Sequence, residues 1–163
     1  SKIFNVNKKA FFKSLKSFKG LAHRHEIFLK FDNYTFINDS KATSFESTKY
    51  ALRSNDNIIW ITGGLPKKND KININEFKNK IIKVFIIGNH TKFFVKQINK
   101  KTKFEIAYNL RTAVNKVFKF LKNKKRLTIL FSPASASYDQ FKNFVDRGDK
   151  FKLLVNQYAK KFI

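Results

Sequence analysis

Three short runs of apolar residues constrain the fold of this chain more than any other feature. They lie at 57–62 (NIIWIT), 83–88 (KVFIIG) and 127–131 (LTILF), and none alternates apolar with polar positions. A strand without alternation is buried on both faces, which is typical of parallel sheets covered by helices. Helical patterns separate the three runs, so the sequence predicts an α/β fold built on a parallel sheet.

Helices are expected around these strands. The clearest spans 110–121, where apolar residues recur at the i, i+3, i+4, i+7 spacing of an amphipathic helix. The other expected helices lie at 8–19, 44–53, 74–80, 91–98 and 151–162. Gly20 is expected to close the first of them as its C′ residue. Thr43 or Ser44 is expected to cap the N-terminus of the second.

An antiparallel hairpin is expected near the N-terminus. Residues 25–31 and 34–39 alternate well enough to form two strands, and Asp32-Asn33 supplies a two-residue turn between them. The alternating apolar residues of the first strand are Ile27, Leu29 and Phe31. With a weak strand at 104–107, the predicted fold is a doubly wound, mostly parallel, Rossmann-like sheet with helices on both faces and an N-terminal β-hairpin.

Small and polar residues follow three of the predicted strands. They are Asp39-Ser40-Lys41-Ala42-Thr43, Gly63-Gly64-Leu65-Pro66-Lys67-Lys68 and Ser132-Pro133-Ala134-Ser135-Ala136-Ser137. Ligands of such sheets bind outside the carboxyl ends of the strands. Hydroxyls, helix N-terminal amides and lysines suit an anion. Each segment taken alone is also compatible with a helix cap, a turn or a tight loop, but the three together predict an anion-binding edge.

The net charge of +24 needs a separate explanation. Lys and Arg total 35 against 11 acidic residues. Four residue types with codons made only of A and T, namely Lys, Asn, Ile and Phe, make up 83 of the 163 residues. Arg, the preferred bidentate binder of phosphates, occurs only five times. Compositional drift therefore explains the charge better than nucleic-acid binding, and no specific nucleic-acid partner is expected.

Several classes of protein are excluded or disfavoured by what the sequence lacks. There is no cysteine, so disulfide scaffolds and cysteine nucleophiles are excluded, and a reducing compartment fits. No apolar run approaches the ~18 residues of a membrane span. Residues 1–10 contain no apolar segment of the kind found in signal peptides. We therefore expect a cytoplasmic protein without a membrane partner.

The sequence also lacks the common catalytic motifs. It contains no GxxxxGK[ST], no GxGxxG and no GxSxG. His23 and His25 are spaced as a metal pair could be, but no third ligand is evident, so no metal site is expected. His90 lies in a polar turn and is expected to be incidental. No residue of the chain is expected to be catalytic by itself.

At these strand ends the chain resembles the C-terminal domain of the Mur ligases, most closely the members that add D-glutamate. The matching stretches are 20–26 (GLAHRHE), 36–43 (FINDSKAT), 63–64 (GG), 131–144 (FSPASASYDQFKNF) and 147–148 (RG). The resemblance runs in order over about residues 8 to 160. The stretch 131–144 is the most specific, because it separates the D-glutamate ligases from their sister enzymes.

The resemblance implies an ATP-dependent, amide-forming ligase of three domains. Residues 1–20 would be the last helix of the central ATPase domain, and residues 21–163 the C-terminal domain that brings the amino acid. ATP would convert the carboxylate of UDP-N-acetylmuramoyl-L-alanine into an acyl phosphate, which D-glutamate attacks. The phosphate-binding loop and the magnesium ligands would lie in the missing domains. The 163 residues alone are then expected to be inactive, to bind no cofactor stably and to be monomeric.

The resemblance also implies roles for individual residues. Those expected to bind D-glutamate are Lys41, Thr43, Lys67, Ser137, Tyr138 and Phe144. Those expected to touch ATP on domain closure are Arg24, at a phosphate, and Asp39, at the ribose. A dianionic amino acid needs charge-assisted anchors, which lysines near helix N-termini supply.

The chain departs from the family pattern at a few positions. Ser135 stands where the family has cysteine, Ala22 replaces a common proline, and Tyr138 replaces a smaller apolar residue. The loop after Gly64 is also unusual, which leaves the choice between Lys67 and Lys68 open. Three alternatives remain at this stage: another Mur or folylpolyglutamate-type ligase domain, a basic nucleic-acid-binding module, and a structural remnant without a ligand.

Overall fold

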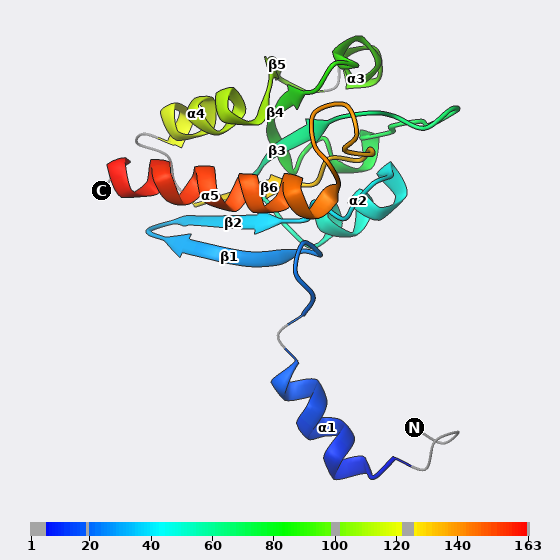
Figure 1. Ribbon diagram of the computed structural model, residues 1–163, viewed down its shortest axis with the longest axis vertical. Coiled ribbons are helices and arrows are strands. Elements are labelled where there is room, and N and C mark those ends of the chain that lie inside the picture. Colours follow the sequence, from blue (N-terminus) through cyan, green and yellow to red (C-terminus); the bar gives the residue numbers. More distant parts are fainter. Residues whose placement is uncertain (1–5, 19, 99–101, 122–125, 163) are drawn as a thin grey trace.

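A six-stranded sheet lies at the centre of the computed structural model, which describes residues 6–18, 20–98, 102–121 and 126–162 (Figure 1). The strands are β1 (Glu26–Phe31), β2 (Tyr34–Asn38), β3 (Ile58–Gly63), β4 (Ile81–Ile87), β5 (Phe104–Tyr108) and β6 (Leu127–Phe131). Their order is β1-β2-β6-β3-β4-β5. All neighbours pair in parallel except β1 and β2, which form the expected hairpin.

Helices cover both faces of this sheet, as predicted. The helices are α1 (Lys8–Ser17), α2 (Phe45–Arg53), the short 3-10 helix η1 (Asn75–Phe77), α3 (Thr91–Ile98), α4 (Leu110–Leu121) and α5 (Phe144–Phe162). Helices α4 and α5 pack on one face, around Phe36, Ile61 and Phe131. Helices α2 and α3 pack on the other face with η1, around Trp60 and Leu130. Two cores explain why the central strands carry apolar residues on both faces of the sheet.

Several predicted elements match the structure closely, and four differ. The helix expected over 151–162 begins at Phe144, and the helix expected over 74–80 is only the single turn η1. The strand expected over 83–88 begins two residues earlier, at Ile81. Polar residues interrupt the apolar periodicity near the starts of α5 and β4, so the pattern misses them, whereas over 74–80 it predicts more helix than forms.

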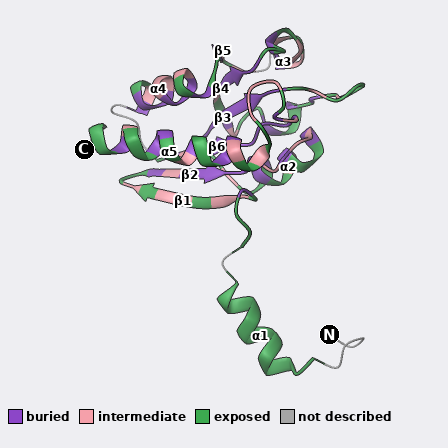
Figure 2. Ribbon diagram, in the orientation of Figure 1, coloured by how far each residue is buried: buried purple, intermediate pink, exposed green. Residues whose placement is uncertain are grey.

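The first predicted helix also ends early. Helix α1 stops at Ser17, and the extended backbone of Phe18 is its C-cap, so Gly20 is not the C′ residue (φ +83°). Lys19, at the end of the predicted range, lies outside the described residues. None of the residues of α1 is buried, and the helix lies away from the sheet (Figure 2).

The first strand of the hairpin carries a bulge that the sequence did not predict. The register of β1 against β2 shifts between Ile27 and Leu29. Ile27 is consequently 50% exposed, and Phe28 packs instead on Phe36 and Phe151. A bulge places two residues opposite one, which ends the strict alternation.

No helix among the described residues is both long enough and apolar enough to cross a membrane.

Candidate functional site

The three polar strand ends meet at one edge of the sheet. Asn38, Phe131 and Ile61 lie in register across β2, β6 and β3. The segments that follow these strands therefore leave the sheet side by side, and we call residues 39–43, 63–68 and 132–138 the carboxyl edge. Backbone hydrogen bonds hold this edge together: Asp39 N donates to Phe131 O at the end of β6 (2.8 Å), and Gly63 N donates to Pro133 O (3.0 Å).

Asp39 is a buried carboxylate at this edge. Its Oδ2 accepts a hydrogen bond from Ser132 Oγ (2.6 Å), and its Oδ1 accepts one from the backbone N–H of His25 (3.0 Å). Burial raises the pKa of Asp39 above its ordinary value, although both hydrogen bonds act in the opposite direction. The side chain is thus fixed in place from two separate segments of the chain.

A small pocket of about 290 Å³ opens beside Asp39. Its lining residues are Arg24, His25, Asp39, Lys41, Ala42, Ser47 and Tyr50. Two cations, Arg24 and Lys41, thus share one hollow with the carboxylate of Asp39. The pocket brings together both residues expected to contact ATP and one expected to contact D-glutamate. Such a mixture suits a ligand that carries phosphate together with hydroxyl groups.

Lys41 is connected to the start of helix α5. Its Nζ lies 3.8 Å from the centroid of the Phe144 ring, a close cation–π contact. The neighbouring Ser40 donates from Oγ to the carbonyl of Phe144 (2.8 Å). The segment after β2 and the N-terminus of α5 are thus held together, and two residues expected to bind D-glutamate are in contact.

The segments after β3 and β6 are also joined. Leu65 and Ala136 form an isolated antiparallel bridge with two backbone hydrogen bonds (2.9 and 3.0 Å). Gly64 makes this approach possible, because a Cβ there would lie 2.4 Å from the carbonyl oxygen of Ala136, and its φ is +136°. Ser137, next after Ala136, is buried. The bridge therefore brings the residues that precede Lys67 next to those that precede Ser137.

The remaining expected site residues lie on the same edge with different exposure. Thr43 is half-buried, Lys67 and Lys68 are both exposed, and Tyr138 is 72% exposed. The Lys67 N–H donates to Asp70 Oδ2 (2.8 Å), which fixes the backbone of this loop. Because both side chains are exposed, the assignment of Lys67 rather than Lys68 to the site stays a prediction.

The two histidines considered as a metal pair have separate structural partners. Nδ1 of His23 lies 2.9 Å from the side-chain amide of Asn38, whereas Nε2 of His25 lies 2.9 Å from that of Asn55. No group of three or more His, Cys, Asp or Glu side chains suited to a metal occurs among the described residues.

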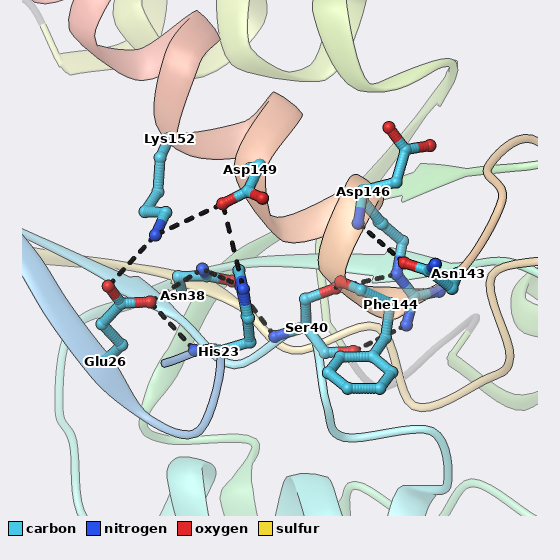
Figure 3. A network of polar contacts seen from close by, with 10 residues as sticks. His23, Glu26, Asn38, Ser40, Asn143, Phe144, Asp146, Asp149 and Lys152 are labelled. Atoms are coloured by element: carbon cyan, nitrogen blue, oxygen red, sulfur yellow. Dashed lines mark hydrogen bonds and ion pairs between the residues drawn. The ribbon is translucent and has the colours of Figure 1, made fainter. Parts of the chain in front are cut away.

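His23 belongs to a polar network that the sequence did not predict (Figure 3). Glu26 accepts from the N–H of His23 (2.9 Å), from Asn38 Nδ2 (3.1 Å) and from Lys152 Nζ (3.2 Å). Partial burial raises the pKa of Glu26, but the hydrogen bonds from His23 and Lys152 outweigh it and lower the pKa overall. The network attaches the segment that enters the domain to helix α5.

Arg147 is a second residue whose importance the sequence did not reveal. It lies within the matching stretch 147–148, but its side chain turns out to be completely buried beneath the carboxyl edge. Burial lowers the pKa of Arg147 to about 10. The guanidinium therefore stays charged at neutral pH.

Comparison with known proteins gives relatives over nearly the whole chain. The UDP-N-acetylmuramoylalanine–D-glutamate ligase of Wolbachia sp. subsp. Brugia malayi is 39% identical over 162 residues, which cover 99% of this chain and 32% of the relative. The ligases of the same name from Wolbachia pipientis wMel and Rickettsia felis are 38% and 34% identical, over 92% and 99% of this chain. The chain thus spans about a third of the length of these relatives.

A solved structure supports the fold. UDP-N-acetylmuramate-alanine ligase MurC from Thermotoga maritima superposes on 98% of this chain and 35% of its own chain, with a TM-score of 0.59 and 15% identity. At this identity the likeness concerns the fold alone. No protein-family model matches the chain.

Proposed function

We infer that this chain, which belongs to the Mur ligase family, is the C-terminal domain of an ADP-forming ligase. The proposed enzyme adds D-glutamate to UDP-N-acetylmuramoyl-L-alanine, a step in the synthesis of peptidoglycan precursors. Residues 21–163 would form this domain, and residues 1–20 the last helix of the domain before it. The fully unburied helix α1 supports this boundary, although residues 1–5 and 19 lie outside the described part.

One observation carries the proposal: the Lys41–Phe144 contact lies next to the pocket that holds Arg24 and Asp39. Lys41 lines that pocket and also faces Phe144. A nucleotide bound beside Asp39 and an amino acid bound beside Phe144 would therefore be neighbours. An enzyme that joins an amine to an activated carboxylate needs this proximity.

We assign the residues of the edge to two ligands. The ligands of D-glutamate would be Lys41, Thr43, Lys67, Ser137, Tyr138 and Phe144. Arg24 would contact a phosphate of ATP, and Asp39 the ribose hydroxyls. A buried carboxylate such as Asp39 accepts hydrogen bonds from hydroxyls, whereas exposed cations such as Arg24 suit phosphate oxygens.

The chain supplies binding and orientation, and the other domains would supply activation. In the proposed reaction the carboxylate of UDP-N-acetylmuramoyl-L-alanine is activated as an acyl phosphate. The amine of D-glutamate attacks its carbonyl carbon, phosphate leaves and an amide forms. The sequence contains no GxxxxGK[ST] motif, so the phosphate-binding loop and the magnesium ligands would come from the preceding domains. We also propose a monomeric enzyme of the cytoplasm, where both nucleotide-containing substrates occur.

Nuclear magnetic resonance on the 163-residue chain tests the assignment to two ligands. We expect D-glutamate to shift backbone amides in 39–43 and 132–144, and ATP to shift those of residues 24, 25 and 39. L-Glutamate at equal concentration is the control for the amino acid. A short DNA duplex tests the nucleic-acid alternative, which predicts binding that falls steeply with salt.

Shifts from D-glutamate at the carboxyl edge, absent with L-glutamate, would support the proposal. Shifts spread over the lysine-rich surface with every anion, including DNA, would contradict it. The matching kinetic test uses the full-length enzyme, in which consumption of ATP should depend on both UDP-N-acetylmuramoyl-L-alanine and D-glutamate.

A further inference from the structure

A buried cation lies beneath the carboxyl edge. Arg147 is in the second turn of α5 and has no exposed surface. Its Nε donates to Ser40 Oγ (3.0 Å), and its Nη2 donates to the carbonyls of Ser40 (2.8 Å) and Ser135 (3.0 Å). No carboxylate of the described residues forms an ion pair with it, so its main partners are neutral oxygens.

These partners come from two separate parts of the carboxyl edge. Ser40 stands between Asp39 and Lys41, and Ser135 stands two residues before Ser137. The Ser40 hydroxyl that accepts from Arg147 also donates to the carbonyl of Phe144. A single guanidinium therefore links the segment after β2, the segment after β6 and the start of α5.

The segment after β3 lies against the same side chain. A Cβ added to Gly64 would lie 3.3 Å from Arg147 Nη1 and 2.6 Å from Ser135 Oγ. Gly64 thus allows its loop to approach the guanidinium and Ser135 closely. All three segments of the carboxyl edge consequently contact one buried group or its direct partners.

Asp139 adds a further link near Arg147. Its charge favours the charged form of Arg147, and its Oδ2 accepts a hydrogen bond from the backbone N–H of Asn89 (3.0 Å). Gly88 makes room for this contact, because a Cβ there would lie 2.5 Å from Asp139 Oδ2. The segment after β4 is thereby tied to Asp139, which directly follows the segment 132–138.

Only arginine suits this arrangement. Its planar guanidinium presents five N–H donors in a fixed fork, whereas lysine offers a compact ammonium that cannot reach the same acceptors together. A buried cation costs desolvation free energy that apolar side chains of equal size do not. The role of Arg147 is therefore to hold the segments of the carboxyl edge in place.

We propose that Arg147 is a positioning residue for the D-glutamate site, which sets the spacing between Lys41 on one segment and Ser137 on another. It acts through Ser40 and Ser135 and does not touch the substrate. The identity of the ligand rests on the proposed function, but the linkage of the three segments by Arg147 does not.

Hydrogen exchange of the 163-residue chain tests the linkage without any ligand. The variants are Arg147→Lys, which keeps the charge, and Arg147→Met, which keeps the length without donors. We expect the hydrogen-bonded amides of Ala42, Leu65 and Ala136 to exchange about fivefold or more faster, because both variants lose hydrogen bonds that hold these segments. The exchange rates of amides in the middle of β3 and β4 should keep their wild-type ratio to one another.

Val117→Ala is the matched control. Val117 is buried in α4 on the same face of the sheet, so the substitution destabilises the core by creating a cavity away from Arg147. It should not selectively accelerate exchange at the carboxyl edge. If Arg147→Met fails to fold, Arg147→Lys and Ser40→Ala provide the same measurement. Uniform acceleration in the Arg147 variants, as in Val117→Ala, would overturn the proposal.

Steady-state kinetics of the full-length enzyme test the link to the substrate. We expect Arg147→Lys to raise the KM for D-glutamate about tenfold, because two or more weak contacts are misplaced together. The KM for ATP should change less, since Ser132 and His25 hold Asp39 independently of Arg147. Equal changes in both KM values, or none, would overturn the positioning role. If the wild-type enzyme does not use D-glutamate at all, the proposed function fails, and hydrogen exchange still decides the linkage.

Discussion

At the scale of single residues, Asp39 is held where its charge is disfavoured. It is 8% exposed, and its pKa is raised by burial. A carboxyl group with a raised folded-state pKa contributes its full stability below its unfolded pKa and loses that contribution as the pH rises through the folded pKa. The charged form of Asp39 therefore opposes folding at neutral pH, which is the cost expected for a carboxylate kept to bind a ligand.

Replacement of Asp39 by Asn tests whether the charge of Asp39 lowers the stability of the fold at neutral pH. We expect Asp39→Asn to unfold at a higher urea concentration than the wild type at pH 7, and the difference to disappear as the pH falls towards ~4. Asp56→Asn is the control, because the Asp56 side chain is 75% exposed and pairs with Lys80 at the surface. A lower midpoint for Asp39→Asn at pH 7 would mean that its hydrogen bonds outweigh burial.

Lys41 should be the principal anchor of D-glutamate, because it lies between Phe144 and the pocket that contains Asp39. In the full-length enzyme, Lys41→Ala should raise the KM for D-glutamate about tenfold or more and lower kcat, as expected for the loss of a hydrogen bond to a charged group. Parallel Lys67→Ala and Lys68→Ala variants decide which of these two exposed lysines assists it. Wild-type kinetics for Lys41→Ala would refute the assignment.

At the scale of elements, the start of helix α5 organises the site. Asn143 precedes the helix, and its Oδ1 accepts from the N–H of Asp146 (2.9 Å), while its carbonyl accepts from the N–H of Arg147 (3.1 Å). This is N-capping, which satisfies donors that the first turn leaves free. The cap fixes Phe144 and Arg147, the two residues through which α5 contacts the carboxyl edge.

Loss of this cap should weaken both the helix and the site. Asn143→Ala is expected to lower the free energy of unfolding by ~1 kcal/mol in urea denaturation. Asn143→Ser, which can still cap, should lower it by less. If Ala and Ser variants are equally stable, the side chain of Asn143 does not act as a cap.

The central elements could be predicted because their patterns arise from burial. The run 127–131 packs into both cores and the helix 110–121 into one of them, so their apolar patterns report the fold. The start of α5 could not, because its buried positions Arg147 and Gly148 read as polar or neutral. The bulge in β1 was missed for a similar reason: it depends on pairing with β2, which no local pattern encodes.

The edge itself was predictable, but its interior was not. Parallel strands place their carboxyl ends together, so three polar segments after three predicted strands already indicated one site. The resemblance to known ligases then suggested individual ligands such as Lys41. Nothing in the sequence showed that Arg147 contacts Ser40 and Ser135, since such contacts depend on the folding of loops far apart in the chain.

At the scale of the whole molecule, the charge is far from balanced. Lys and Arg exceed acidic residues by 24. The acids that form ion pairs are surrounded by cations, as at Glu105, which faces both Lys83 and Lys116. These lysines lower the pKa of Glu105, but partly exposed pairs of this kind stabilise proteins little. Repulsion among the remaining lysines is therefore the larger electrostatic effect on the folded chain.

This imbalance predicts an unusual response to salt. An increase from about 0.01 M to about 0.1 M shortens the Debye length from ~30 Å to ~10 Å, which screens repulsion across the whole domain. Thermal unfolding monitored by circular dichroism should therefore show a Tm that rises with NaCl. Sodium fluoride at equal ionic strength should give the same rise, because screening depends on ionic strength and not on the anion. A rise with one salt only would instead indicate anion binding at a site such as the pocket beside Asp39. A Tm that falls with both salts would show that the ion pairs around residues such as Glu105 outweigh the repulsion.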